Sequence, residues 1–424
     1  MLVHHSGRDY NEAASEAAAE ARKRMEAIIE GGRQSALMVH ERVNNHVPVD
    51  RIAKGKALRF GYVAQPAFKP AVLEAKPLGD PALTGLVNDE GIPLQVAALL
   101  DGEPQAQSVE EEEGPSKLVL EIADSTKELI HSHALTQIAG KAGIPSKYLK
   151  ELAESGNPIL QSLALEILDT HYRGTDLDAS RFLLRSVDGE LRGFLSDRYR
   201  RLDNRPLLDA FIEGCRDVGA VPVDGTVSDI RVAMKAYLPF ILEPVPNEVM
   251  LVGVQWGNSD FGAAAYTLSL TVLRLWCTNK AVMENSLRNV HLGARLDDSI
   301  NYSERTYRLD TETNVSATRD TVRELLSPQR VNAIQAVIKG AAEKKVEWNK
   351  LSPKIIAALT KSEQELAHEM FDGSDDIVML PPQRTIWRAS NVLSWIAGRT
   401  EDADHRLDLE RAAGELLDKV RKAA

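Results

Sequence analysis

Apolar and polar positions divide the chain into segments with different predicted structures. Residues 11–30 are rich in alanine, carry alternating charges and precede Gly31 and Gly32, so we predict a helix that ends at these glycines. Residues 57–100 mix short apolar runs with many Pro and Gly, which is typical of short strands and turns. Residues 101–116 contain four consecutive glutamates, and we predict an acidic linker there, with a phosphate-mimicking tail as the alternative.

After the linker, the pattern predicts a short strand and then two helices joined by a tight turn. Ala139, Gly143 and Leu149 have the spacing of a helix-turn-helix, with Gly143 and Pro145 between the helices. One interpretation is a DNA-contacting element, and the other is an ordinary helical hairpin closed by a glycine. In the first case, the second helix presents Lys147, Tyr148 and Lys150 to the ligand.

Two hairpins are expected in the middle of the chain. Asp188-Gly189 separates two apolar runs, a strong hairpin signal because the first turn residue tolerates positive φ and the second favours it. A helix is predicted at 206–218, and a second hairpin turns at 257–260. Beyond Ser316 the apolar spacing becomes helical. The fold class predicted is α+β, with an antiparallel sheet of hairpins packed on helices, a helical C-terminal subdomain and an irregular N-terminal region.

Four parts follow from this pattern, because 424 residues exceed one ordinary core. They are an N-terminal helical arm with a small β-rich segment (1–100), the acidic linker (101–116), an α+β core domain (117–315) and the helical C-terminal subdomain (316–424).

Composition narrows the class of protein. Apolar residues make up 43% of the chain and charged residues 27%, as in packed globular proteins. No apolar stretch is long enough for a membrane span and the N-terminus lacks a secretory signal, so we expect a cytoplasmic protein without a membrane partner. Cys215 and Cys277 lack metal-ligand spacing. The net charge of −11 argues against a wholly basic surface, so any nucleic-acid site must be a local patch.

Four segments resemble a known family. ALTQIAGKAGIPSKYLKEL, LRGFLSDRYRRLDNRPLLDA, LTVLRLWCTNKAV and TIWRASNVLSWIAG, in this order, look like the phage- and plasmid-borne family called domain of unknown function 932. The resemblance covers roughly residues 117–415 and implies a bacterial host cell, but it names no catalytic residue. More remotely, the predicted fold is similar to single-strand annealing proteins of the RecT, Erf and Rad type, which oligomerise around a basic groove.

The sharpest candidate patch for nucleic acid follows the first hairpin. Arg198, Arg200 and Arg201 can clamp phosphates, and Tyr199 offers a ring for base stacking, with Arg192 nearby. On a strand, Arg198 and Arg200 would share one face. Acidic residues lie between these arginines in sequence, so ion pairs within the protein are the alternative.

A second basic cluster lies in the helical end. Lys344 and Lys345 precede Trp348 and are a further nucleic-acid candidate. Trp387 is expected to face the core, with its neighbour Arg388 in solvent.

No catalytic motif is present: we find no Walker loop, no GxGxxG after a strand, no HExxH and no GxSxG. We therefore expect no catalytic residue, cofactor or metal. The function expected is that of a phage-type protein that binds single-stranded DNA as a homo-oligomer and promotes annealing or recombination without nucleotide hydrolysis, possible partners being phage or host recombination proteins. The alternatives are a self-assembling structural or interaction protein and a helix-turn-helix regulator.

Overall fold

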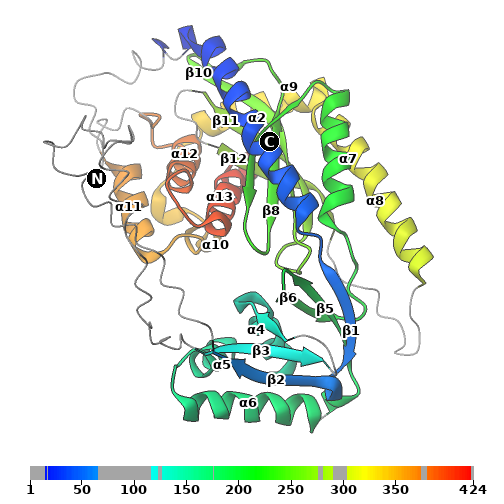
Figure 1. Ribbon diagram of the computed structural model, residues 1–424. Coiled ribbons are helices and arrows are strands. Elements are labelled where there is room, and N and C mark those ends of the chain that lie inside the picture. The colour runs from blue at the N-terminus through cyan, green and yellow to red at the C-terminus, as the bar shows by residue number, and fades with distance from the viewer. Residues whose placement is uncertain are drawn as a thin grey trace, which may run out of the picture.

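The computed structural model confirms the α+β class (Figure 1). It describes residues 15–16, 18–64, 116–122, 127–174, 176–275, 280–289, 303–373 and 380–421. Two sheets lie one above the other in Figure 1, and the chain passes between them from α2 to β1 and from β6 to α7. Among the described helices, none has the length and apolar character needed to cross a membrane.

The first sheet has six strands in the order β1-β5-β6-β4-β3-β2, and all its pairs are antiparallel except β4 with β6. Its strands are β1 (Val49–Lys54), β2 (Leu58–Val63), β3 (Lys117–Ile122), β4 (Glu128–Ile130), β5 (Arg181–Val187) and β6 (Glu190–Ser196). Short 3₁₀ helices η1 (Gly55–Ala57) and η3 (Asp176–Asp178) lie beside it. One face of the sheet packs on α4 (Ser132–Ala142), α5 (Ser146–Ala153) and α6 (Pro158–Arg173) around Tyr172 and Phe194.

The first hairpin confirms the sequence prediction. Asp188 has a φ of 52° and Gly189 a φ of 78°, the two positive values that the Asp-Gly turn requires. Leu184 on β5 faces the helices, whereas its neighbours Leu183 and Arg185 point to the opposite face. That opposite face receives part of the second sheet.

The second sheet is antiparallel, with the order β12-β11-β10-β8-β7 and β9 beside β10. Its strands are β7 (Val221–Val227), β8 (Val232–Tyr237), β9 (Leu242–Val245), β10 (Glu248–Asn258), β11 (Tyr266–Arg274) and β12 (Lys280–Asn289). The second expected hairpin is therefore present as β10 and β11. Its turn begins at Ser259, slightly later than the sequence indicates.

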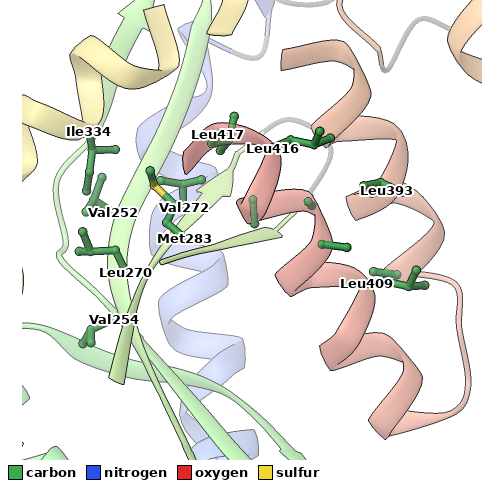
Figure 2. Close-up of a cluster of buried hydrophobic side chains, with 14 of the residues drawn as sticks. Val252, Val254, Leu270, Val272, Met283, Ile334, Leu393, Leu409, Leu416 and Leu417 are labelled. Carbon is green, nitrogen blue, oxygen red and sulfur yellow. The ribbon is translucent and has the colours of Figure 1, made fainter. Parts of the chain in front are cut away.

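Helices surround the second sheet. They are α7 (Asn204–Asp217), α8 (Glu304–Leu325), α9 (Pro328–Glu343), η4 (Trp348–Lys350), α10 (Pro353–Ile356), α11 (Lys361–Asp372), α12 (Ile386–Ala397) and α13 (Ala403–Arg421). Figure 2 shows Ile334 of α9 on one side of Val252 and Val272, and Leu416 and Leu417 of α13 on the other. The helical end is confirmed, although its first helix starts at Glu304, before the expected boundary at 316.

The N-terminal helix differs from the prediction. We expected it to end at Gly31-Gly32, but α2 (Ala21–Asn45) runs through both glycines. Gly32 lies against β7 so closely that a Cβ at this position would overlap the carbonyl of Val223. The glycine therefore permits close packing of helix on strand rather than ending the helix. Ala36, Val39 and Val43 of α2 join the main core, so this helix is not a loose arm.

The strands β1 and β2 also change the expected domain division. They pair with β5 and β3, which follow residues 101–116 in the chain. Residues 49–63 and 117–196 thus build one sheet, and the segment expected as a linker does not separate two folded units. The predicted acidic linker itself lies outside the described residues except for Ser116.

Candidate nucleic-acid interface

The arginine run lies in the connection between the two sheets. Strand β6 ends at Ser196 and α7 begins at Asn204, so Arg198 and Arg200 are not on a strand, and the expectation that they share a strand face is wrong. The Arg198 side chain is partly buried, and its backbone N–H donates to the Ser196 hydroxyl at 3.3 Å. Residues 197–203 therefore form a short connection between the two sheets rather than an extended hairpin.

Tyr199 belongs to a small apolar cluster where the first sheet meets the second. Its side chain is 7% exposed and packs on Leu183 and Leu195. The phenol Oη donates to the carbonyl of Ser259 at 3.3 Å, and burial raises the pKa of Tyr199. In this arrangement the ring is covered by protein, whereas a base-stacking platform needs an open face.

Two arginines of the run form ion pairs with distant residues. Arg200 Nε donates to Asp310 Oδ2 of α8 at 2.5 Å, and this hydrogen bond is the main reason why the pKa of Arg200 is raised. Arg201 Nε lies 3.3 Å from Asp50 Oδ2, and its guanidinium lies 5.4 Å from the ring centre of Tyr307. Both side chains therefore tie the connection to neighbouring elements.

Arg192 is buried at the junction of the two sheets, where β6 lies near the β7–β8 turn. Its Nε donates to Glu190 at 2.9 Å, and its Nη1 lies 3.6 Å from Asp229 in the β7–β8 turn. The sequence left two interpretations of the arginines open, and this geometry favours ion pairs within the protein. The partners Asp50, Asp229 and Asp310 are distant in sequence, and no local signal could have identified them.

The β10–β11 turn docks on the first sheet through backbone carbonyls. Arg185 Nη1 donates to the carbonyl of Asp260 at 2.7 Å, and Gln137 Nε2 donates to that of Phe261 at 2.9 Å. Gly262 has a φ of 77°, which an L side chain rarely adopts. Its missing Cβ also leaves room for Leu195. Side chains of the first sheet and α4 thus hold the main chain of the second sheet.

Arg185 is the centre of this junction. It is 2% exposed, and it also donates to Asp50 at 2.8 Å and to Asp203 at 2.6 Å. Burial alone would lower the pKa of Arg185, but the carboxylates of Asp203 and Asp50 raise it. Sequence patterns did not predict this role of Arg185, because its partners Asp50 and Asp260 come from distant parts of the chain.

Asp260 gives the junction a pH dependence. Burial is the main cause that raises the pKa of Asp260 to about 7. The charge of Arg185 and the hydrogen bonds from Asn204 lower this pKa but do not cancel the effect of burial. Since the folded protein binds this proton more tightly than the unfolded chain, the stability that the protonated group contributes is lost as pH rises toward 7. The free energy of unfolding is expected to fall by up to about 1.4 kcal/mol per pH unit between pH 4 and 7.

Urea unfolding of the parent and of Asp260→Asn across this pH range measures the effect. The neutral amide cannot titrate, so the slope should be flatter in the variant. Equal slopes in both proteins would show that Asp260 does not control the pH dependence.

The predicted helix-turn-helix is present as α4, a turn and α5. Gly143 ends α4 in the left-handed conformation with a φ of 71°, and α5 starts at Ser146. Leu149, Leu152 and Ala153 are the buried residues of α5, and the lysines lie on the exposed part of the helix. The Lys147 and Lys150 side chains are 89% and 50% exposed, and Tyr148, which follows Lys147 in the sequence, is 46% exposed.

The cations of α5 make only weak pairs. Lys147 lies 3.8 Å from Glu151, and Lys150 lies 3.9 Å from Glu154, both at i,i+4 spacing on an exposed helix. Such pairs contribute about 0.3–0.5 kcal/mol, so a phosphate can replace the carboxylate at little cost. Among the predicted residues, these lysines and Tyr148 combine exposed charge with an exposed ring.

The helical end offers charge without an exposed aromatic ring. Lys344 and Lys345 are exposed, but Trp348 is buried against Phe371. Trp387 is buried as predicted. Its neighbour Arg388 was expected in solvent but is 2% exposed, because its guanidinium donates to backbone carbonyls at the end of α11 and beyond it. Arg388 therefore holds α11 and α12 together.

Within the described ranges, no group of three or more His, Cys, Asp or Glu side chains could hold a metal ion. Cys215 is buried and Cys277 lies outside the described residues. No family model, no curated protein and no solved structure matches this chain. The resemblance to domain of unknown function 932 stays a prediction that rests on the four sequence segments.

Proposed function

We propose that the protein binds nucleic acid, with single-stranded DNA as the preferred form, through the exposed face of α5. The observation that carries this proposal is the exposure of Lys147, Tyr148 and Lys150 on one short helix after a left-handed glycine turn. The arginine run contributes indirectly, because its ion pairs fix the connection between the two sheets.

The chemistry of this face suits unpaired bases. Lysine ammonium groups neutralise phosphates, and the exposed ring of Tyr148 on the same helix can stack on a base whatever its identity. The mechanism is non-covalent: charge neutralisation holds the backbone, and stacking holds a base extended for pairing. Annealing of complementary strands follows if several protomers line one strand, which is why we include a homo-oligomer in the proposal.

Duplex binding is the second candidate function, and the α4–α5 turn favours it. A helix-turn-helix presents the start of its second helix to the major groove, where Lys147 would lie. The two candidates differ in what they require of Tyr148. Single-strand binding uses its ring for stacking, whereas duplex binding does not need an unpaired base.

A test uses fluorescence anisotropy with labelled single-stranded and duplex oligonucleotides of equal length at about 50 and 200 mM salt. The parent should bind the single strand more tightly, with affinity falling as salt rises. Tyr148→Ala should weaken single-strand binding by about 1–3 kcal/mol and leave duplex binding unchanged. The double variant Lys147→Glu, Lys150→Glu should lower the salt slope for both forms.

A matched control places the same charge change on another surface, with Lys339→Glu and Lys361→Glu, two exposed lysines of α9 and α11. Equal weakening by the control and the α5 variant would show a general effect of net charge and would refute the α5 site. Tighter binding to duplex, insensitive to Tyr148→Ala, would establish the duplex alternative. If neither form of DNA bound at low salt, both candidate functions would be refuted.

A further inference from the structure

An open groove of about 930 Å³ lies in the helical end, between α11 on one side and η4 with α10 on the other. Its floor and one wall are apolar: Trp348 and Leu351 are largely buried beneath it, and Ile356 is partly buried. Pro353 and Ala357 are exposed at its margin. This volume is large enough to accept several side chains from one face of a docked segment.

The walls of the groove are fixed by hydrogen bonds. Gln364 Nε2 of α11 donates to the carbonyls of Leu359 at 2.9 Å and Ile356 at 3.3 Å, which holds α11 against α10. Thr360 caps α11 reciprocally with Glu363, and Glu363 also lies 2.9 Å from His405 of α13. The groove therefore has a preformed shape, which lowers the entropic cost of binding.

The charge of the groove has one sign. Glu365 and Glu369 line it from α11, and no lysine or arginine is among the lining residues that the structure describes. Both glutamates are exposed, and the described part of the chain gives neither of them an ion pair. They are four residues apart on one helix face, where two like charges repel each other. His368, also in the lining, lies 3.2 Å from Asp372.

We propose that this groove docks an amphipathic helical segment of a partner protein whose apolar stripe is bordered by Lys or Arg. The apolar side chains enter over Trp348 and Ile356, and the basic side chains pair with Glu365 and Glu369. Recognition of an apolar helix face by a groove, with charges that fix its orientation, is a common way to bind peptides. A cationic ligand also relieves the repulsion between the two glutamates.

The experiment measures anisotropy of a labelled, capped peptide of leucine and lysine with helical spacing, added to the full chain. A peptide with glutamate in place of lysine is the second probe. Micromolar binding of the lysine peptide is expected, with weaker binding at higher salt and no binding of the glutamate peptide. Glu365→Gln with Glu369→Gln and, separately, Ala357→Trp should each reduce affinity about tenfold, since one removes the charge and the other fills the groove.

Glu26→Gln with Glu343→Gln is the matched control, because both glutamates are exposed and lie on other helices. The net charge of −11 attracts any basic peptide, so equal affinity of the parent, both groove variants and the control would overturn the proposal. It would also be overturned if neither peptide bound, or if the glutamate peptide bound as tightly. A change in oligomer mass on Ala357→Trp without peptide would assign the groove to a second copy of this chain instead.

Discussion

Replacing Glu410 with Ala is expected to lower the free energy of unfolding by about 3–5 kcal/mol, because it leaves a buried ammonium group without its main partner. Lys235 of β8 is 2% exposed, and its Nζ lies 2.5 Å from Glu410 Oε2 of α13. Asp224 of β7 is the second partner, at 3.3 Å. Burial alone would lower the pKa of Lys235, but Glu410 and Asp224 raise it, so the lysine stays charged at neutral pH.

A double variant separates the lost ion pair from lost packing. Lys235→Met with Glu410→Leu removes both charges and fills similar volume, so it should recover most of the lost stability. Urea unfolding at pH 7 measures all three proteins. Because the pKa of Lys235 is raised, its contribution is complete below the unfolded pKa of a lysine and is lost only in strongly alkaline solution. A loss below about 1 kcal/mol for Glu410→Ala would show that the pair does not hold α13 to the sheet.

Replacing either of two helical glycines with alanine is expected to change the free energy of unfolding, but in opposite directions. Gly414 of α13 lies against β12, and a Cβ there would overlap the carbonyl of Val282. The helix must then move away from the strand, so we expect Gly414→Ala to cost about 3 kcal/mol. Gly31 of α2 has no atom within contact distance of its Cβ position, so Gly31→Ala should stabilise the protein by about 0.5–1 kcal/mol.

Thermal and urea unfolding of the two single variants check this contrast. The substitution and the secondary structure are the same in both, so helix propensity alone predicts stabilisation of both. The difference between the two changes in unfolding free energy therefore measures the effect of the close approach of α13 to β12. Stabilisation by Gly414→Ala would mean that α13 does not pack on the backbone of that strand.

Local sequence signals predicted the local structures. Asp188-Gly189 indicated its hairpin because backbone conformation at a two-residue turn depends on the turn residues themselves. Gly143 likewise indicated the end of α4. Gly31-Gly32 misled the prediction, because a glycine can also mark a close contact with another element, and that contact is set by tertiary packing.

The candidate sites also divide into those that local sequence predicts and those that depend on tertiary packing. The exposed lysines of α5 follow from helical spacing around the buried Leu149, which the sequence shows directly. The ion pairs of Arg200 and Arg201 do not, because Asp310 and Asp50 come from elements more than a hundred residues away in sequence. The groove beside α11 was not predicted either, since its shape depends on how α10 and α11 meet.

The register between β2 and β3 places the ends of one long segment side by side. Val63 and Lys117 are paired neighbours in the sheet, although they are far apart in sequence. In topological terms, β2 and β3 are consecutive strands that pair across a long separation in sequence. Closing a longer loop adds only about 0.6 kcal/mol for each doubling of length. The pairing of β2 with β3 can therefore tolerate a change in the number of residues between the two strands over evolution while the first sheet keeps its strand order.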